Sequence, residues 1–190
     1  MKRILLLAVF IAAVSVSAIG QVTKSKVAAA MAKFPGVERS DMEALLTAKI
    51  AVGIALPTWL PTGFTLEKIQ SRIGRNVSLD DREFIVIYSR KLDNGKRQRF
   101  ALEAGFDGLG GLPYDTTKTI RTPVGPIDLM YEPKDEDGNK QRNYVITEWF
   151  TVGKNAVHYL GTYGDGEDDK SVTIISLTDT EKILRSLNRL

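Results

Sequence analysis

The stretch from Arg82 to Phe106 constrains the fold more than any other part of this sequence. Residues 82–90 (REFIVIYSR) have a continuous apolar middle, which indicates a central strand or one buried on both faces. Asp93-Asn94-Gly95 follows and predicts a tight hairpin turn. The returning strand alternates, with Phe100, Leu102, Ala104 and Phe106 on one face and Arg99, Ala101 and Glu103 on the other. A buried antiparallel hairpin is therefore the expected centre of the fold.

Further strands are predicted on the C-terminal side of this hairpin. The expected strands are Lys118–Thr122, Ile127–Tyr131, Asn143–Val152 and Ala156–Tyr163, with Val172–Leu177 as a last short strand or the approach to a helix. The turns between them are expected at Gly125-Pro126, at Lys134–Lys140 around Asp137-Gly138, and at Gly153–Asn155. From Phe64 onward the chain should therefore consist mainly of strands.

Helices are predicted at both ends of the chain. The first two should cover Lys24–Phe34 and Asp41–Ile50, the second with Ser40 as N-cap and Glu43 completing a capping box. The last should start at Thr178 with Glu181 in its capping box, and bury Ile183, Leu184, Leu187 and Leu190. The predicted fold class is α+β: a twisted antiparallel sheet of about six or seven strands, with N-terminal helices and a C-terminal helix packed on it.

Residues 1–20 have the pattern of a signal peptide. Lys2 and Arg3 precede an uncharged apolar run, Ile4–Val14, which is too short to span a bilayer. Small residues follow, and cleavage is expected after Ala18 or after Gly20. The alternative is an uncleaved N-terminal anchor. The expected division is a signal peptide (1–20), a helical segment (21–55) and an antiparallel α+β domain (56–190), located in the periplasm or secreted.

Composition excludes several classes of function. Without Lys2 and Arg3 the chain has 24 basic and 23 acidic residues, so it lacks the basic surplus of a nucleic-acid-binding protein. It has no cysteine, which excludes disulfides, cysteine nucleophiles and cysteine metal sites. No later segment is apolar over the length of a membrane span, so no transmembrane helix is expected in the mature chain.

Two segments resemble a known family. Leu56–Ile69 (LPTWLPTGFTLEKI) resembles the LP-x-aromatic-LP-x-G-aromatic-x-L opening of a bacterial extracytoplasmic domain family of unknown function. Trp149, Gly153, Tyr159-Leu160-Gly161 and the closing EKILRSL resemble that family's W-x-x-x-G…Y-L-G…helix ending. The resemblance covers residues 56–190. It implies a twisted antiparallel sheet outside the cytoplasm, as in anti-sigma-factor-like and sporulation-associated proteins, and no catalytic residues; the anchored inner domain expected ahead of it is replaced by the signal peptide.

No catalytic, metal or cofactor site is predicted. The single histidine, His158, has neither a cysteine nor a second histidine to share a zinc ion, so a surface or partly buried strand position is expected. The glycine-rich segment Gly105–Thr116 leads into Pro113, not into the helix that a phosphate loop requires. The acidic segments 135–139 and 165–169 do not have the ligand spacing of an EF-hand and are expected to be solvated turns.

A ligand-binding set is nevertheless predicted from aromatic residues and from the glycine-rich loop. Its members are Trp59, Gly105, Asp107, Gly110, Tyr114, Trp149 and Tyr159. The alternative for the aromatic residues, together with Phe64, is that they fill the core, which is the more common role. A basic group is expected to protect an edge hairpin from pairing with other sheets; the alternative is contact with phosphates, anionic lipid or acidic glycans. Its members are Arg90, Lys91, Lys96, Arg97 and Arg99.

Three functions fit these observations. The first is a non-enzymatic binding or accessory module of the bacterial cell envelope, with an unknown envelope protein or lipid as partner and a peripheral contact with the envelope. The second is a hydrolase of envelope polymers that uses two carboxylates from among Glu103, Asp107, Asp115 and Glu148. The third is a structural envelope protein.

Overall fold

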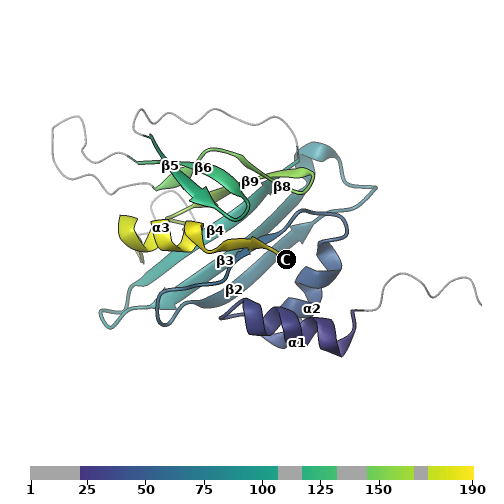
Figure 1. The fold of residues 1–190 in the computed structure, drawn as a ribbon, viewed down its shortest axis with the longest axis horizontal. Helices are drawn as coiled ribbons and strands as arrows, with labels where there is room; N and C mark the ends of the chain where they lie inside the picture. Colours follow the sequence, from purple (N-terminus) through teal and green to yellow (C-terminus); the bar gives the residue numbers. More distant parts are fainter. Residues whose placement is uncertain (1–21, 107–116, 132–144, 165–170) are drawn as a thin grey trace, which may run out of the picture.

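The computed structural model of the chain describes residues 22–106, 117–131, 145–164 and 171–190. Its helices are α1 (Lys24–Lys33), α2 (Arg39–Ala48) and α3 (Leu177–Arg185), with a short 3₁₀ turn at Leu79–Asp81. Its strands are β1 (Ala55–Pro57), β2 (Thr65–Arg72), β3 (Glu83–Lys91), β4 (Arg97–Gly105), β5 (Thr117–Thr122), β6 (Gly125–Met130), β7 (Ile146–Thr147), β8 (Phe150–Val152), β9 (Asn155–Leu160), β10 (Val172–Thr173) and β11 (Leu187–Arg189). The expected α+β class is confirmed (Figure 1). No described helix combines the length and the apolar composition needed to cross a membrane.

The large sheet is antiparallel along its main path and contains seven strands there, in the order β2-β3-β4-β9-β7-β6-β5. Strand β8 pairs with β9, and β10 adds the one parallel pair of the described sheet, to β4. The hairpin β3–β4 forms as predicted: Gly95 adopts a positive φ of 77°, and Leu92 N–H donates to Lys96 O at 2.8 Å. Strand β3 is buried along its middle because it lies between β2 and β4.

The inner face of the sheet carries a row of aromatic rings. Phe100 of β4 stacks on Tyr88 of β3, with ring centroids 5.0 Å apart, and lies 5.6 Å from Phe64 and 5.3 Å from Tyr159. All four side chains are buried. They belong to one continuous core together with buried residues of α1, α2 and α3. The helices and the sheet therefore share a single core.

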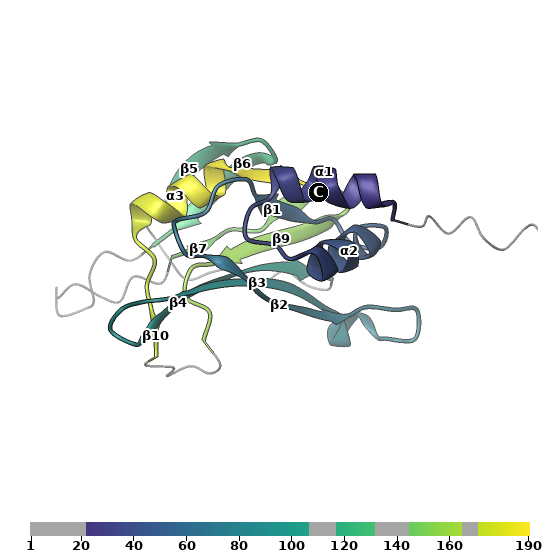
Figure 2. The same ribbon diagram turned by 90° about the horizontal axis from the view of Figure 1, so that it is seen from below.

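A second, smaller cluster lies on the outer face of the same strands. Ile85, Ile87 and Ala101 alternate with the residues of the inner face and are covered by Leu160 and Tyr163. Figure 2 shows the resulting layers: α1, α3 and β1 lie on one side of the core, and β2, β3 and β4 lie on the other. The outer face of these three strands is thus directed away from the helices.

The second helix begins earlier than the sequence pattern indicated. It covers Arg39–Ala48 and follows Glu38, so the predicted cap at Ser40 is wrong, and no side chain caps this end. Instead of completing a capping box, Glu43 lies 3.9 Å from Arg39, one turn away. Ile50, expected on the apolar stripe, lies beyond the helix and is 73% exposed.

The predicted C-terminal helix is also corrected. Its N-cap is Ser176, whose Oγ accepts from Asp179 N at 3.1 Å, and not Thr178. The helix stops at Arg185, and Leu187–Arg189 form β11, which pairs with β1 in a separate two-stranded sheet. In the described structure β11 is the strand partner of β1. If α3 continued through Leu187–Arg189, the backbone N–H and C=O groups of β1 that bond to β11 would lose their partners.

Gly53 meets the turn between β8 and β9 more closely than any side chain would allow. Its N–H donates to Asn155 Oδ1 at 2.9 Å, and a Cβ at this position would overlap the carbonyl oxygen of Val152. The loop after α2 is thereby held against the end of β8. A larger residue must push the two segments apart.

The variant Gly53→Ala should therefore lower the free energy of unfolding by about 2–3 kcal/mol, as overpacking does. Urea denaturation followed by circular dichroism measures this. The matched control is Gly74→Ala, where the added Cβ would lie 3.7 Å from Val77 Cγ2, an ordinary contact. If both variants lost the same stability, the close approach at Gly53 would not be limiting.

Tyr88 and Tyr159 differ in how their hydroxyl groups are satisfied. Tyr159 Oη lies 3.4 Å from Thr180 Oγ1, whereas Tyr88 Oη has no hydrogen-bond partner among the described residues. Tyr88→Phe should therefore raise the free energy of unfolding by about 1 kcal/mol, because an unsatisfied buried hydroxyl is destabilising. Tyr159→Phe should leave it unchanged or lower it. Denaturant titration of both variants tests this, and a loss for Tyr88→Phe would contradict it.

The same burial makes stability depend on alkaline pH. Burial raises the pKa of both hydroxyls well above the ordinary range. Since the unfolded chain ionises near pH 10 while the folded chain keeps these protons, the free energy of unfolding should fall as pH rises above about 10. The fall should be shallower in Tyr88→Phe, which retains one of the two groups.

Candidate functional site

The outer face of the sheet holds a cluster of three polar and aromatic side chains, Glu103, Trp149 and His158, which we call the histidine cluster. His158 lies on β9 and its side chain is 9% exposed. Its Nε2 lies 3.1 Å from Glu103 Oε2, on the residue opposite it in the β4–β9 pair. The indole of Trp149 stacks on the imidazole, with ring centroids 3.9 Å apart and planes 13° from parallel.

An irregularity in the sheet directs Trp149 onto His158. Ile146 is opposite Leu160, so an unbroken register would put residue 150 opposite residue 156, yet Phe150 is opposite Val157. One extra residue therefore lies between β7 and β8, as in a β-bulge, which turns a side chain out of the regular alternation. The single strand expected over 143–152 is accordingly divided into two within the described residues. Thr147 and Phe150 stay buried on either side, while Trp149 is half-buried.

The hydrogen bond to Glu103 decides which nitrogen of His158 is available. A carboxylate can only accept, so Nε2 donates, and in the neutral ring Nδ1 carries the lone pair. Nδ1 is buried and has no partner in the described part of the chain. It is therefore out of reach of a ligand, and His158 is a positioning residue for Glu103 and Trp149.

Glu103 is the member of the cluster that can meet a ligand. Its side chain is 35% exposed, and its Oε2 is held by His158. The other oxygen, Oε1, has no partner among the described side chains and can accept from a donor outside the protein. Trp149 adds an aromatic surface beside it. The cluster can thus offer a fixed acceptor next to a flat apolar ring.

A second polar group lies farther along the outer face. Arg99, 4% exposed, donates to Glu67 from Nε at 3.0 Å and from Nη2 at 2.7 Å. Arg97 lies 3.8 Å from the same carboxylate. The expectation that these arginines protect an edge hairpin is wrong, because β3 and β4 are interior strands. These side chains form an ion-pair group that links β2 to β4 across the intervening strand β3.

The predicted ligand-binding residues do not form one group. Gly105 lies two residues beyond Glu103 on β4 and is opposite Ala156, so it shares the outer face with Trp149. Tyr159 points to the opposite face and is fully buried. Trp59 lies on the other side of the core, beside α3. Asp107, Gly110 and Tyr114 lie outside the described residues.

The aromatic residues that were alternatively expected in the core also divide. Phe64 and Tyr159 are buried there. Trp59 is 38% exposed, so the core expectation is wrong for this residue. Its ring lies beside Lys182, whose Nζ is 5.5 Å from the ring centroid. Trp149 is half-buried and packs on His158 instead.

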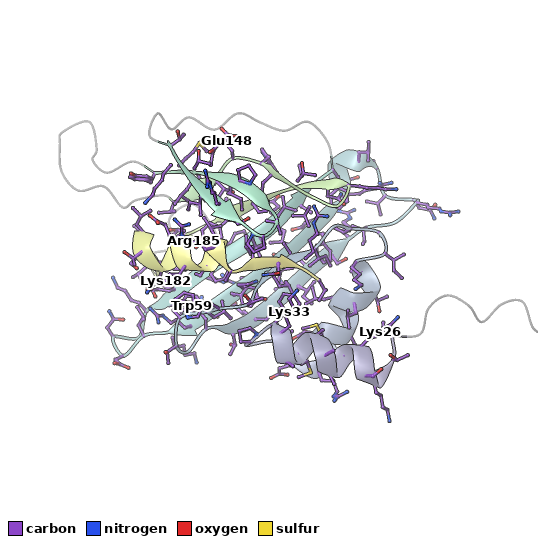
Figure 3. All side chains as sticks on the ribbon, in the orientation of Figure 1. Lys26, Lys33, Trp59, Glu148, Lys182 and Arg185 are labelled. Carbon is purple, nitrogen blue, oxygen red and sulfur yellow. The ribbon has the colours of Figure 1, made fainter. Side chains whose placement is uncertain are left out.

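Of the four carboxylates considered for hydrolysis, the structure describes two. Glu103 belongs to the histidine cluster. Glu148 lies in the bulge, where its N–H donates to Asp128 O at 2.8 Å, and Figure 3 shows it at the upper edge of the molecule. Asp107 and Asp115 lie outside the described residues, as do the acidic segments 135–139 and 165–169. No group of three or more His, Asp or Glu in the described ranges is placed to hold a metal ion.

The role of His158 was missed from the sequence. The residue was expected on a strand, at the surface or partly buried; it does lie on a strand, β9, but it is buried and packs between Glu103 and Trp149. Glu103 and Trp149 were each expected on a strand from the sequence. Their cluster with His158 depends on β4 pairing with β9, which is not its neighbour in the chain, so no local pattern indicates it.

The comparisons with known proteins add no relative. No protein-family model matches the chain. Neither a curated protein nor a solved structure matches it. The resemblance of residues 56–190 to an extracytoplasmic domain family therefore stays a prediction.

The geometry of the histidine cluster can be tested through stability. Glu103→Ala removes the partner of a buried imidazole and should lower the free energy of unfolding by about 1–3 kcal/mol. Glu103→Gln can still accept through its amide oxygen and should cost less. The control is Glu148→Ala, which removes a carboxylate with no side-chain partner in the described structure. Thermal and urea unfolding should rank the three variants in this order, and an equal effect of all three would contradict the arrangement.

Proposed function

We propose that this chain is an exported binding module of the bacterial cell envelope, which takes its ligand on the outer face of the sheet at the histidine cluster. The observation that carries the proposal is the stack of Trp149 on His158, with Glu103 held at its side. Solvent-exposed acceptors are ordinarily mobile. Here the buried His158 holds the carboxylate of Glu103 in place, so the side chain of Glu103 loses less conformational entropy when a ligand binds.

The proposal of export rests on the N-terminal sequence. Lys2, Arg3 and the apolar run Ile4–Val14 have the order and lengths of a signal peptide. Val22 packs against the core and Thr23 caps α1, and both residues lie C-terminal to the expected cleavage sites. Cleavage after Ala18 or Gly20 would leave these contacts intact.

The chemistry of the site limits the ligand class. Oε1 of Glu103 accepts hydrogen bonds, and the indole of Trp149 offers apolar contact area at little cost in side-chain entropy. Ammonium, amide and hydroxyl groups all complement this pair. Such groups occur on envelope proteins and on the head groups of envelope lipids and polymers. We propose binding of one of these, without chemical conversion.

The test is native mass spectrometry of the protein purified from the envelope fraction of a producing cell. The expected mass is that of a chain starting at Ile19 or Gln21, with a non-covalent adduct that is lost on denaturation. A chain from the envelope fraction that keeps residues 1–18 would overturn the proposed cleavage and favour an uncleaved N-terminal anchor. A processed chain without any adduct would remove a tightly held small ligand and favour a structural role.

Variants assign the adduct to the site. Trp149→Ala and Glu103→Gln should each reduce the adduct at least about tenfold, as loss of a central aromatic or of a charged acceptor does in other interfaces. Trp59→Ala is the matched control, because it removes the other tryptophan, on the far side of the core. Retention of the adduct by Trp149→Ala would show that it binds elsewhere. Covalent modification of a supplied envelope polymer would instead favour the hydrolase.

A further inference from the structure

The side of the molecule opposite the histidine cluster carries a group of cations around an exposed tryptophan. Its members are Lys26, Lys33, Trp59, Lys182 and Arg185, which we call the basic face. In Figure 3 these five residues follow one another from α1 to α3, and Figure 2 shows both helices on the same side of the core. The surface therefore joins the N-terminal and the C-terminal helices of the fold.

Backbone contacts hold Trp59 in the middle of this surface. Thr58 N–H donates to Ser186 O at 3.0 Å, and Ser186 Oγ donates to Trp59 O at 3.2 Å. On the other side, Leu60 Cδ1 lies 3.1 Å from where a Cβ on Gly36 would be, so the segment after Trp59 packs on the segment after α1. Trp59 itself remains 38% exposed. The tryptophan is thus fixed at the surface between two helices.

The charges of the basic face are mostly unneutralised. Helix α1 contains three lysines and no acidic residue, and Lys26 and Lys33 are two turns apart, on the same side of the helix. Within the described residues, neither of these lysines nor Lys182 lies within ion-pair distance of a carboxylate. Arg185 lies 3.7 Å from Glu181, its one ion-pair partner among the described residues, and its side chain is half exposed.

Two contacts show how these cations are used inside the protein. Lys182 Nζ lies 5.5 Å from the centroid of the Trp59 ring, and Lys33 Nζ lies 4.9 Å from the centroid of Phe34. In both cases the ammonium lies over the face of an aromatic ring, as in a cation–π contact, and both lysines are exposed.

We propose that the basic face docks on the surface of a bilayer that contains anionic phospholipid. Separate lysines around one tryptophan complement a diffuse array of phosphates, since a lysine acts as a point charge and does not require bidentate geometry. Tryptophan is favoured at the level of the lipid head groups, where its ring is apolar and its N–H meets water. This inference uses the side of the molecule opposite the histidine cluster and is independent of the function proposed there.

The charge balance of the chain favours this occupant over a nucleic acid. Without Lys2 and Arg3, basic and acidic residues nearly cancel, so the chain as a whole has little net attraction for a polyanion. A local patch suits a planar surface met from one side. With the basic face on the bilayer, Glu103 and Trp149 would be directed away from the membrane.

The test is partition onto vesicles of phosphatidylcholine with and without phosphatidylglycerol, measured by flotation of the protein purified from the envelope fraction. Binding should require phosphatidylglycerol and should weaken at high salt. The double charge reversal Lys33→Glu with Lys182→Glu should reduce the partition coefficient about tenfold or more. The matched control is Lys68→Glu with Lys91→Glu, which changes net charge equally at exposed positions on β2 and β3.

A second measurement follows Trp59 directly. The chain has two tryptophans, so Trp149→Phe leaves Trp59 as the only indole. Its emission should shift to shorter wavelength with phosphatidylglycerol vesicles and not with phosphatidylcholine alone. Equal binding to both vesicle types, no binding to either, or equal losses in the two double variants would overturn the proposal. So would an unchanged Trp59 emission, or binding to a soluble acidic polymer in preference to vesicles.

Discussion

Phe100 is the side chain on which the core depends, because it contacts three aromatic rings from three separate parts of the chain. Tyr88 comes from the neighbouring strand of the hairpin, Phe64 from the loop before β2, and Tyr159 from β9. Strand β4 can hold this position because β3 uses one of its edges and β9 and β10 share the other. The Phe100 ring thus joins the segment before β2, strand β3 and strand β9 in one core.

The two faces of β4 have separate roles. Inward, Phe100, Leu102 and Ala104 join the main core. Outward, Arg99 is paired with Glu67, and Glu103 is paired with His158. Each outward pair links β4 to another strand of the sheet. A polar residue on this face is therefore not simply solvated, and the outer surface is ordered by contacts between strands that are distant in the sequence.

Local sequence signals predicted the parts of the fold that are local. The β3–β4 hairpin follows from its alternation and from Gly95, and α1 follows from its helical composition. The two capping predictions failed because Glu38 and Ser176 compete with Ser40 and Thr178 as helix starts, and several polar residues in a row allow more than one register. The end of α3 was missed for a different reason. Leu187–Arg189 have helical periodicity but are required as a strand by β1.

The candidate site was predicted only in part, and the limits are physical. Trp149 was identified as an aromatic residue, but its direction depends on a bulge whose extra residue has no distinctive identity. Trp59 is surrounded by prolines and apolar residues, so the sequence favours burial. Its exposure follows from the tertiary contacts of Thr58 and Leu60. Contacts between non-adjacent strands, and not composition, determine which residues meet.

The pairing of β1 with β11 has a consequence for the order of assembly. Residues 55–57 find their strand partner only at residues 187–189. During synthesis from the N-terminus, residues 55–57 are therefore made long before the strand that pairs with them. The pairing of β1 with β11 can form only after nearly all of the described chain has been made. Contacts between residues this far apart in the sequence slow folding, so the closing of this small sheet should be a late step that depends on the last residues of the chain.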